Sequence, residues 1–71
     1  METEITIENL INDGFEVEVY NGKQFFRRGN SMVTYIDCFG KWVPCNPETH
    51  CFNGYLESME QLHRLMEEGG M

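Results

Sequence analysis

Hydrophobic and polar residues alternate over residues 15–19, where three apolar side chains occupy one face of an extended chain and two glutamates the other. Residues 21–22 follow as Asn-Gly, a dipeptide that favours a type I′ hairpin turn because both positions tolerate positive φ. Residues 23–28 supply a second extended segment. The pattern therefore predicts a β-hairpin with one face directed toward a core.

A two-residue turn also sets the register of this hairpin, because each residue faces its mirror position across the turn. The expected pairs are Tyr20–Lys23, Val19–Gln24, Glu18–Phe25, Val17–Phe26 and Glu16–Arg27. In this register Val17 and Phe26 lie on the core side. Glu16 and Arg27 form a cross-strand ion pair, whereas Arg28 points to the core side at the rim of the sheet.

Beyond the hairpin, turn residues separate further β-branched and aromatic segments. A turn at residues 29–31 precedes a third strand at 32–39, and a Gly-Lys turn precedes a fourth strand that begins at Trp42. Pro44 lacks an N–H group, so it ends this strand or lies at a sheet edge. Residues 52–56 are a candidate fifth strand, interrupted by an Asn-Gly pair.

A short helix precedes the strands. Thr6 is a suitable N-cap, and Ile5 before it and Leu10 after it match a hydrophobic staple. Gly14 is expected to end the helix in the left-handed conformation, with Phe15 folding back on Leu10. A helix of about two turns needs tertiary contacts to persist.

The C-terminal segment predicts a second helix. Ser58 is its N-cap, and Gln61 completes a Ser-x-x-Gln capping box. Glu60 and Arg64 are spaced for an i,i+4 ion pair. An apolar stripe at helical spacing is expected to pack on the sheet. Its residues are Met59, Leu62, Leu65 and Met66.

Together these elements predict a single α+β domain over residues 1–71. It is an antiparallel β-meander of four to five strands with a short N-terminal helix and a C-terminal helix packed on one face. The absence of alanine from the chain favours an aromatic-rich sheet over a helical bundle. Two short helices cover only one face, so we expect the other face to contact water or another molecule.

Charge is distributed unevenly along the chain, which carries a formal net charge of -7. Residues 1–22 contain six acidic residues and no basic one, whereas residues 23–41 contain four basic residues and one acidic residue. Such acidity disfavours direct binding to duplex DNA or to an anionic membrane. No apolar run reaches the roughly 20 residues of a membrane span, and no secretory signal opens the chain, so we expect a cytoplasmic protein.

Three cysteines, an odd number, favour free thiols in a reducing compartment. One candidate zinc set lacks the close Cys-x-x-Cys pair of structural zinc sites, so no metal site is expected. It comprises Cys38, Cys45, His50 and Cys51. A disulfide between Cys45 and Cys51 is an alternative in an oxidising environment. The chain also lacks the common catalytic motifs, so we expect neither enzymatic activity nor a cofactor.

The basic segment over residues 23–31 indicates an anion-binding site. Arginine side chains grip phosphate through two parallel hydrogen bonds, and aromatic rings stack on bases. The candidate ligand-binding residues are Lys23, Phe25, Arg27, Arg28, Tyr35 and Trp42. Alternatively, one of the two phenylalanines belongs to the core and the arginines neutralise the glutamates of the first strand.

The acidic segment indicates a different surface, one that binds a protein. It can dock on a basic groove that normally holds nucleic acid, with fast and salt-sensitive association. The candidate residues are Glu4, Glu8, Asp13, Glu16 and Glu18. The alternative is a solvated acidic face without a partner.

The order of elements and the sequences at both ends are also similar to a known class of proteins. The helix Thr-Ile-Glu-Asn-Leu-Ile-Asn-Asp-Gly-Phe, the short meander, and the run Gly-Tyr-Leu-Glu-Ser-Met-Glu-Gln-Leu into the final helix resemble small acidic accessory proteins of phages and mobile elements. Anti-CRISPR and other anti-defence proteins are drawn from that class. The resemblance covers most of the chain in its build, includes no diagnostic motif and transfers no functional residue. It implies a non-enzymatic protein that acts by occupancy in the cytoplasm of a bacterial host.

Two functional hypotheses follow. The first is an anti-defence inhibitor that occupies a host immune protein through the acidic surface. The second is a homo-oligomeric sponge that sequesters a nucleotide second messenger in pockets lined by arginine and aromatic residues. A homodimer through the uncovered face of the sheet is a third alternative. Its contacts would come from Tyr20, Phe25, Val33 and Tyr35.

Overall fold

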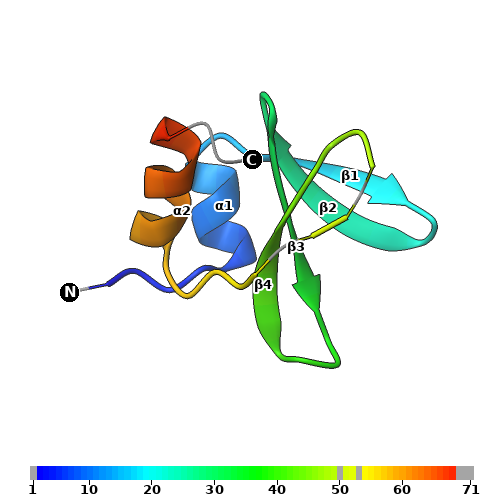
Figure 1. Cartoon of the computed structure of the whole chain (residues 1–71), viewed down its shortest axis with the longest axis horizontal. Coiled ribbons are helices and arrows are strands. Elements are labelled where there is room, and N and C mark those ends of the chain that lie inside the picture. Colours follow the sequence, from blue (N-terminus) through cyan, green and yellow to red (C-terminus); the bar gives the residue numbers. More distant parts are fainter. Residues whose placement is uncertain (1, 50, 53, 69–71) are drawn as a thin grey trace.

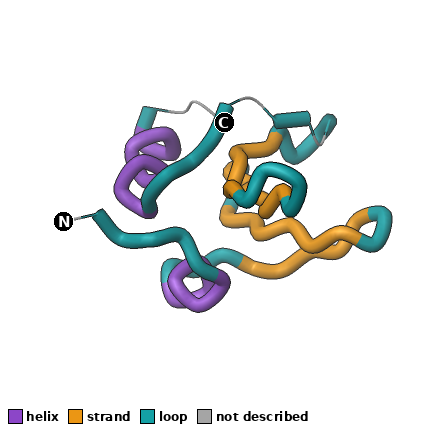
Figure 2. Tube along the Cα trace, turned by 90° about the horizontal axis from the view of Figure 1, so that it is seen from below, coloured by secondary structure: helices purple, strands orange, loops and turns teal. Residues whose placement is uncertain are grey.

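The computed structural model describes residues 2–49, 51–52 and 54–68 and confirms the α+β fold. Its elements are α1 (Ile7–Asn12), β1 (Glu16–Tyr20), β2 (Lys23–Arg28), β3 (Ser31–Ile36), β4 (Lys41–Cys45) and α2 (Met59–Glu67). The strands form one antiparallel sheet in the order β1-β2-β3-β4, and both helices lie on the same side of it (Figure 1). Figure 2 shows the β1–β2 hairpin projecting away from the helices. Within the described residues, no helix has the length and apolar character needed to cross a membrane.

The first hairpin has the register predicted from its two-residue turn. All five expected pairs are present, from Tyr20 opposite Lys23 to Glu16 opposite Arg27. Asn21 and Gly22 have φ values of 52° and 75°, as a type I′ turn requires. The turn therefore determines which residues of this hairpin share a face. Val17 and Val19 lie on the face of buried Phe26 but are exposed, so the prediction that this face of the first strand belongs to the core is wrong for β1.

The second turn is shorter than predicted, and so is the third strand. Ser31 already pairs with Arg28, so the turn contains only two residues. β3 ends at Ile36 because the chain then closes a tight turn. The carbonyl of Ile36 accepts hydrogen bonds from the backbone N–H groups of Phe39 at 3.1 Å and Gly40 at 2.8 Å, and Gly40 has a φ of 63°.

The main core lies between the helices and one face of the sheet. Phe26 and Val33 from the sheet pack with Leu10 of α1 and Leu62 of α2 in one buried cluster. The cluster consists of Ile5, Leu10, Phe15, Phe26, Val33, Leu56, Met59 and Leu62. The predicted staple and the predicted stripe of α2 both contribute to it, and Leu65 and Met66 pack at its margin.

The opposite face of the sheet holds a second, smaller core, so the expectation of a bare face is wrong for β2, β3 and β4. Its buried residues are Phe25, Met32, Val43 and Cys45. Met32 pairs with Cys45 and Thr34 pairs with Val43, so neighbouring strands bring these side chains together. The homodimer face is also wrong, because strand alternation places buried Phe25 on the face opposite to buried Val33.

The predicted fifth strand is reduced to two isolated bridges, Trp42 with Leu56 and Cys45 with Phe52. The outer edge of β4 presents the backbone of every second residue. The carbonyl of Trp42 accepts a hydrogen bond from Leu56 at 2.8 Å, and the N–H of Asn46 donates to the carbonyl of Cys51 at 2.8 Å. Pro44 lies between these two positions and has no N–H to donate, which interrupts a continuous ladder.

Helix α1 begins and ends where the sequence predicted. Thr6 Oγ1 accepts from the N–H of Asn9 at 3.0 Å. At the other end, the N–H of Phe15 donates to the carbonyl of Leu10 and that of Gly14 to the carbonyl of Ile11, both at 3.0 Å. Gly14 has a φ of 100°, so α1 ends in a complete Schellman motif with buried Phe15 above buried Leu10.

The N-terminal segment is attached to the first turn of α2. Ser58 Oγ accepts from the N–H of Gln61 at 3.1 Å, but the Gln61 side chain accepts from Glu57 rather than from Ser58. The backbone N–H of Thr3 donates to Glu60 Oε1 at 2.6 Å, and the carbonyl of Thr3 accepts from the N–H of Met59 at 2.8 Å. Glu60 therefore anchors the N-terminal segment. The predicted ion pair between Glu60 and Arg64 is wrong, because among the described residues the Glu60 carboxylate accepts from Thr3 and forms no ion pair with Arg64.

Candidate ligand pocket

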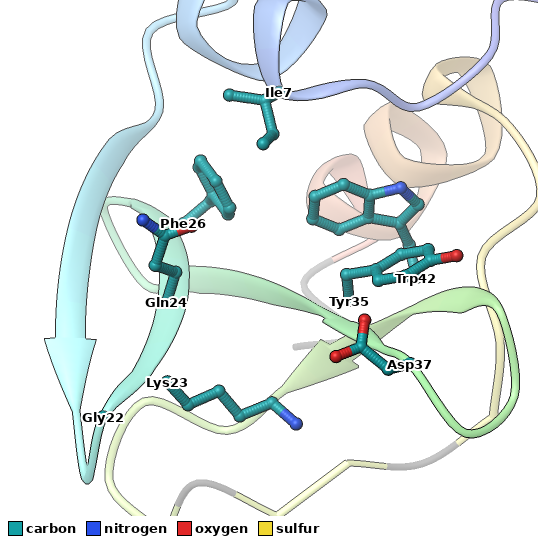
Figure 3. A pocket seen from close by; sticks show the side chains of 8 residues that line it. All are labelled: Ile7, Gly22, Lys23, Gln24, Phe26, Tyr35, Asp37 and Trp42. Carbon is teal, nitrogen blue, oxygen red and sulfur yellow. The ribbon is translucent and has the colours of Figure 1, made fainter.

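A pocket of about 640 Å³ opens between the β1–β2 turn and the β3–β4 end of the sheet (Figure 3). Its lining comes from α1, the β1–β2 turn, β2, β3, β4 and the turn after β3. The residues are Ile7, Gly22, Lys23, Gln24, Phe26, Tyr35, Asp37 and Trp42. The structure therefore brings together three of the six predicted ligand residues, Lys23, Tyr35 and Trp42.

Three aromatic rings form the apolar part of the pocket. Tyr35 and Trp42 are directly opposite in the β3–β4 ladder, and their ring centroids are 5.4 Å apart. Phe26 lies on the other side of Trp42 at 5.5 Å, with the two rings inclined by 68°. Such edge-to-face contacts hold the rings in defined orientations. Phe26 is buried, while Tyr35 remains 41% exposed, so a ligand can reach the ring cluster from the solvent side.

The polar groups of the pocket lie around its mouth. Lys23 and Gln24 come from the start of β2, and Asp37 comes from the turn that follows β3 (Figure 3). The carbonyl of Gln24 accepts a hydrogen bond from Thr34 Oγ1 at 2.9 Å, which ties β2 to β3 beside the pocket. The pocket thus combines one cation, one anion and one neutral amide around an aromatic interior.

The other three predicted ligand residues lie outside this pocket. Phe25 is buried on the opposite face of the sheet. Arg27 Nε donates to the carbonyl of Gly29 at 2.9 Å, and Arg27 Nη1 lies 3.8 Å from Glu18 Oε2. The prediction that Arg27 pairs with Glu16 is wrong, although the two residues are opposite each other as expected. The guanidinium instead pairs with Glu18, the diagonal neighbour on β1, which a long side chain can reach.

Arg28 belongs to a polar cluster that the sequence did not reveal. Arg28 Nη1 donates to Asp13 Oδ2 at 3.2 Å, and His63 Nε2 lies 2.9 Å from the same oxygen. The Asp13 side chain is only 23% exposed. This carboxylate joins the end of α1, the end of β2 and the middle of α2, so the cluster has a structural role. The three residues are far apart in sequence, and their spacing contains no signal of the contact.

The acidic residues predicted to bind a partner come from different elements and differ in exposure. Asp13 is engaged by Arg28 and His63 and is largely covered. Glu4 is exposed before α1 and Glu8 is exposed on α1, whereas Glu16 and Glu18 are exposed on β1. Of the predicted acidic residues, Glu16 and Glu18 are the two that lie together on one strand.

All three cysteines are free thiols, and only Cys45 is buried. Burial raises the pKa of the Cys45 thiol from 9.0 to about 11, although the positive charge of Lys23 opposes this effect. A protonated, covered thiol is a poor nucleophile. Across the described part of the chain, no three His, Cys, Asp or Glu residues are grouped so that they could hold a metal ion. His50, a member of the candidate zinc set, lies outside the described residues.

Comparison with known proteins found no family model, curated protein or solved structure that matches this chain. The geometry of the pocket and of the sheet edges is therefore the basis for a functional proposal.

Proposed function

We propose that this chain is a non-enzymatic binding protein that holds a planar heteroaromatic ligand of the nucleoside or nucleotide class in the pocket between its hairpins. The observation that carries the proposal is the presence of three aromatic rings and three polar side chains in one cavity of about 640 Å³. That volume lies within the range of roughly 300–1,000 Å³ that small-molecule sites occupy. Of the two functional hypotheses drawn from the sequence, this geometry favours nucleotide capture.

Each part of the pocket suits one part of such a ligand. Bases stack on aromatic side chains because every base offers a π-face, and Tyr35 is the accessible ring. The amide of Gln24 can donate to and accept from a base edge, and the carboxylate of Asp37 can accept from an exocyclic amine or a sugar hydroxyl. Lys23 supplies one positive charge for a phosphate.

The charges narrow the class of ligand further. Lys23 is the one basic side chain in the lining, Asp37 lies in the same pocket, and the whole chain carries -7. Arg27 and Arg28 pair with carboxylates elsewhere. A ligand with several phosphates would meet too little positive charge, so we propose a nucleoside or a nucleotide with a single phosphate, including a cyclic mononucleotide.

The single tryptophan of the chain makes the proposal easy to test. Trp42 lines the pocket, so its fluorescence reports on occupancy. We would titrate the protein with adenosine, AMP, 3′,5′-cyclic AMP and ATP, and with the guanine counterparts, and follow the thermal unfolding midpoint in parallel. We expect a saturable change with at least one nucleoside or monophosphate and weaker binding of the triphosphate.

Two variants and a matched control locate the binding. Lys23→Gln should weaken a monophosphate about tenfold and leave its nucleoside unaffected, while Asp37→Asn should weaken both. Lys41→Gln removes an equal charge from an exposed position outside the pocket and should leave binding unchanged. The proposal is wrong if the panel produces no response at millimolar concentration, or if choline binds in an Asp37-dependent manner and the nucleotides do not. Size-exclusion chromatography with and without ligand tests the predicted homo-oligomer.

A further inference from the structure

Strand β1 is an exposed edge of the sheet. All five of its residues are exposed, and Val17 and Val19 reach 46% and 70% although both are aliphatic. β1 pairs with β2 on one side, and no strand of the described residues pairs with its other side. An edge of this kind is a ready template for another strand.

The hairpin register shows which backbone groups this edge presents. In a hairpin closed by a two-residue turn, the pair next to the turn exchanges both hydrogen bonds, and bonded and non-bonded pairs then alternate. Tyr20, Glu18 and Glu16 therefore direct their backbone groups toward β2. Val17 and Val19 direct their N–H and C=O groups outward, where an added strand would bond to them.

The other edge strand of the sheet, β4, is covered by a neighbouring segment, whereas β1 is not. Phe52 and Leu56 each bridge to the edge of β4, and Pro44 removes a donor there. β1 contains no proline and no lysine, and the features that protect it are the side chains of Glu16 and Glu18.

These glutamates select against a second copy of the same strand in the register that pairs all of β1 and in the one centred on Val17. Antiparallel pairing of two β1 strands centred on Glu18 would place the two Glu18 carboxylates opposite each other, and pairing centred on Val17 would place Glu16 opposite Glu18. Like charges directly opposite each other destabilise a strand pair. A partner strand with basic residues at the same positions would instead gain two favourable cross-strand contacts. The Glu18–Arg27 contact is exposed on both sides and offers little competition.

We infer that the β1 edge binds an extended segment of a partner protein in which basic and apolar residues alternate. The backbone of that segment bonds to Val17 and Val19, its basic side chains pair with Glu16 and Glu18, and its apolar side chains cover the exposed valines. This mode of recognition is β-strand addition, in which backbone bonds supply affinity and alternate side chains supply specificity. The edge is a separate surface from the nucleotide pocket.

The test uses the whole chain labelled with ¹⁵N and a seven-residue peptide that alternates valine and lysine. We expect amide shift changes confined to residues 15–21 and slower hydrogen exchange at Val17 and Val19. A peptide of the same composition with its lysines in one block should bind at least tenfold more weakly. Binding should weaken as salt increases, because the contacts are exposed charge pairs.

Two variants distinguish the contribution of the glutamate charges to peptide binding from that of the backbone hydrogen bonds. The double variant Glu16→Lys, Glu18→Lys should lose at least tenfold in affinity for the alternating valine–lysine peptide. It should gain affinity for a third peptide, in which glutamate replaces each lysine. Val19→Pro removes one outward N–H and leaves the bonds to β2 intact, so it should abolish the shifts at β1. The inference is overturned if the block peptide binds equally well, if the shifts lie elsewhere, if either variant binds like the wild type, or if the edge is already occupied by a second copy at working concentration.

Discussion

The two faces of the sheet are packed by different means. On the helix side, the core joins residues that are far apart in sequence, such as Leu10, Val33 and Leu62. On the opposite side, the core joins residues of neighbouring strands, such as Met32 and Cys45. The first core therefore depends on the docking of the helices and the second on the meander itself. The comparison indicates that the core on the helix side attaches the helices to the sheet, and that the core on the opposite face joins neighbouring strands to one another.

The largest effect should come from the helix side. Leu62 is fully buried in α2, and Leu62→Ala removes three heavy atoms from the middle of the main core. Such a change costs about 2–5 kcal/mol, while a domain of this size has a total stability of roughly 4–10 kcal/mol. Urea denaturation should show a large fall in the midpoint. Leu65→Ala, at the margin of the same cluster, should cost clearly less, and equal midpoints for the two variants would contradict this account.

The thiol of Cys45 reports on the second face. With its pKa raised to about 11, it should contain about a hundredfold less thiolate at pH 8 than an ordinary cysteine. Labelling with a disulfide reagent should therefore modify Cys38 and Cys51 quickly and Cys45 only after denaturant is added. Because the folded pKa is above the unfolded value of 9.0, this group favours folding below pH 9. That contribution should be lost between about pH 9 and pH 11. Rapid labelling of all three thiols in the native protein would show that the second core opens readily.

A truncation on the second face should have a smaller effect than Leu62→Ala. Val43 is fully buried beside Met32 and Cys45. Val43→Ala removes two methyl groups and should cost about 2 kcal/mol. Because the second core depends on the sheet and not on helix docking, the helical signal in far-ultraviolet circular dichroism should persist at low urea. If Val43→Ala destabilises more than Leu62→Ala, the ranking of the two faces is reversed.

The polar cluster on the helix side should contribute less again. Asp13→Asn removes the charge that Arg28 and His63 share. Because both partners are substantially exposed, the loss should be about 1 kcal/mol or less. It should shrink in high salt, since exposed charges are screened. Glu48→Gln, an exposed carboxylate in a loop, is the matched control and should leave the urea midpoint unchanged.

The smallest effect should appear as a pH dependence at the N-terminal segment. The backbone N–H of Thr3 donates to Glu60 and lowers the pKa of that carboxyl below its ordinary value of 4.5. A depressed pKa adds stability above the unfolded pKa, and this stability is lost as the pH falls through the folded pKa. Glu60→Gln should therefore be slightly less stable than the wild type at pH 7 and equal to it in strong acid. A difference that does not change with pH would exclude this contact as the cause.

Much of the local structure could be predicted because its causes lie within a few consecutive residues. The Asn-Gly turn determined the register of the first hairpin, and Thr6 and Gly14 determined both ends of α1. Ser58 likewise determined the start of α2. In each case a side-chain oxygen or a missing Cβ acts on backbone groups that are near in sequence.

Predictions that depended on distant residues were less successful. The guanidinium of Arg28 was expected to serve a ligand, but Asp13 and His63 are brought to it by the packing of both helices. Alternation within a strand showed that Phe25 and Phe26 point to opposite faces. It could not show that the second face would be closed by Val43 and neighbouring residues.

The elements, their caps and the alternation of each strand could be read from the amino-acid sequence, because these follow from backbone geometry and from side chains acting over one turn or one pair. The folded arrangement was needed to show which predicted ligand residues share a cavity, which arginines pair with carboxylates and which sheet edge stays open. Those outcomes depend on the twist of the sheet and on the positions of the helices. Many weak long-range contacts determine these together, so no short stretch of sequence records them.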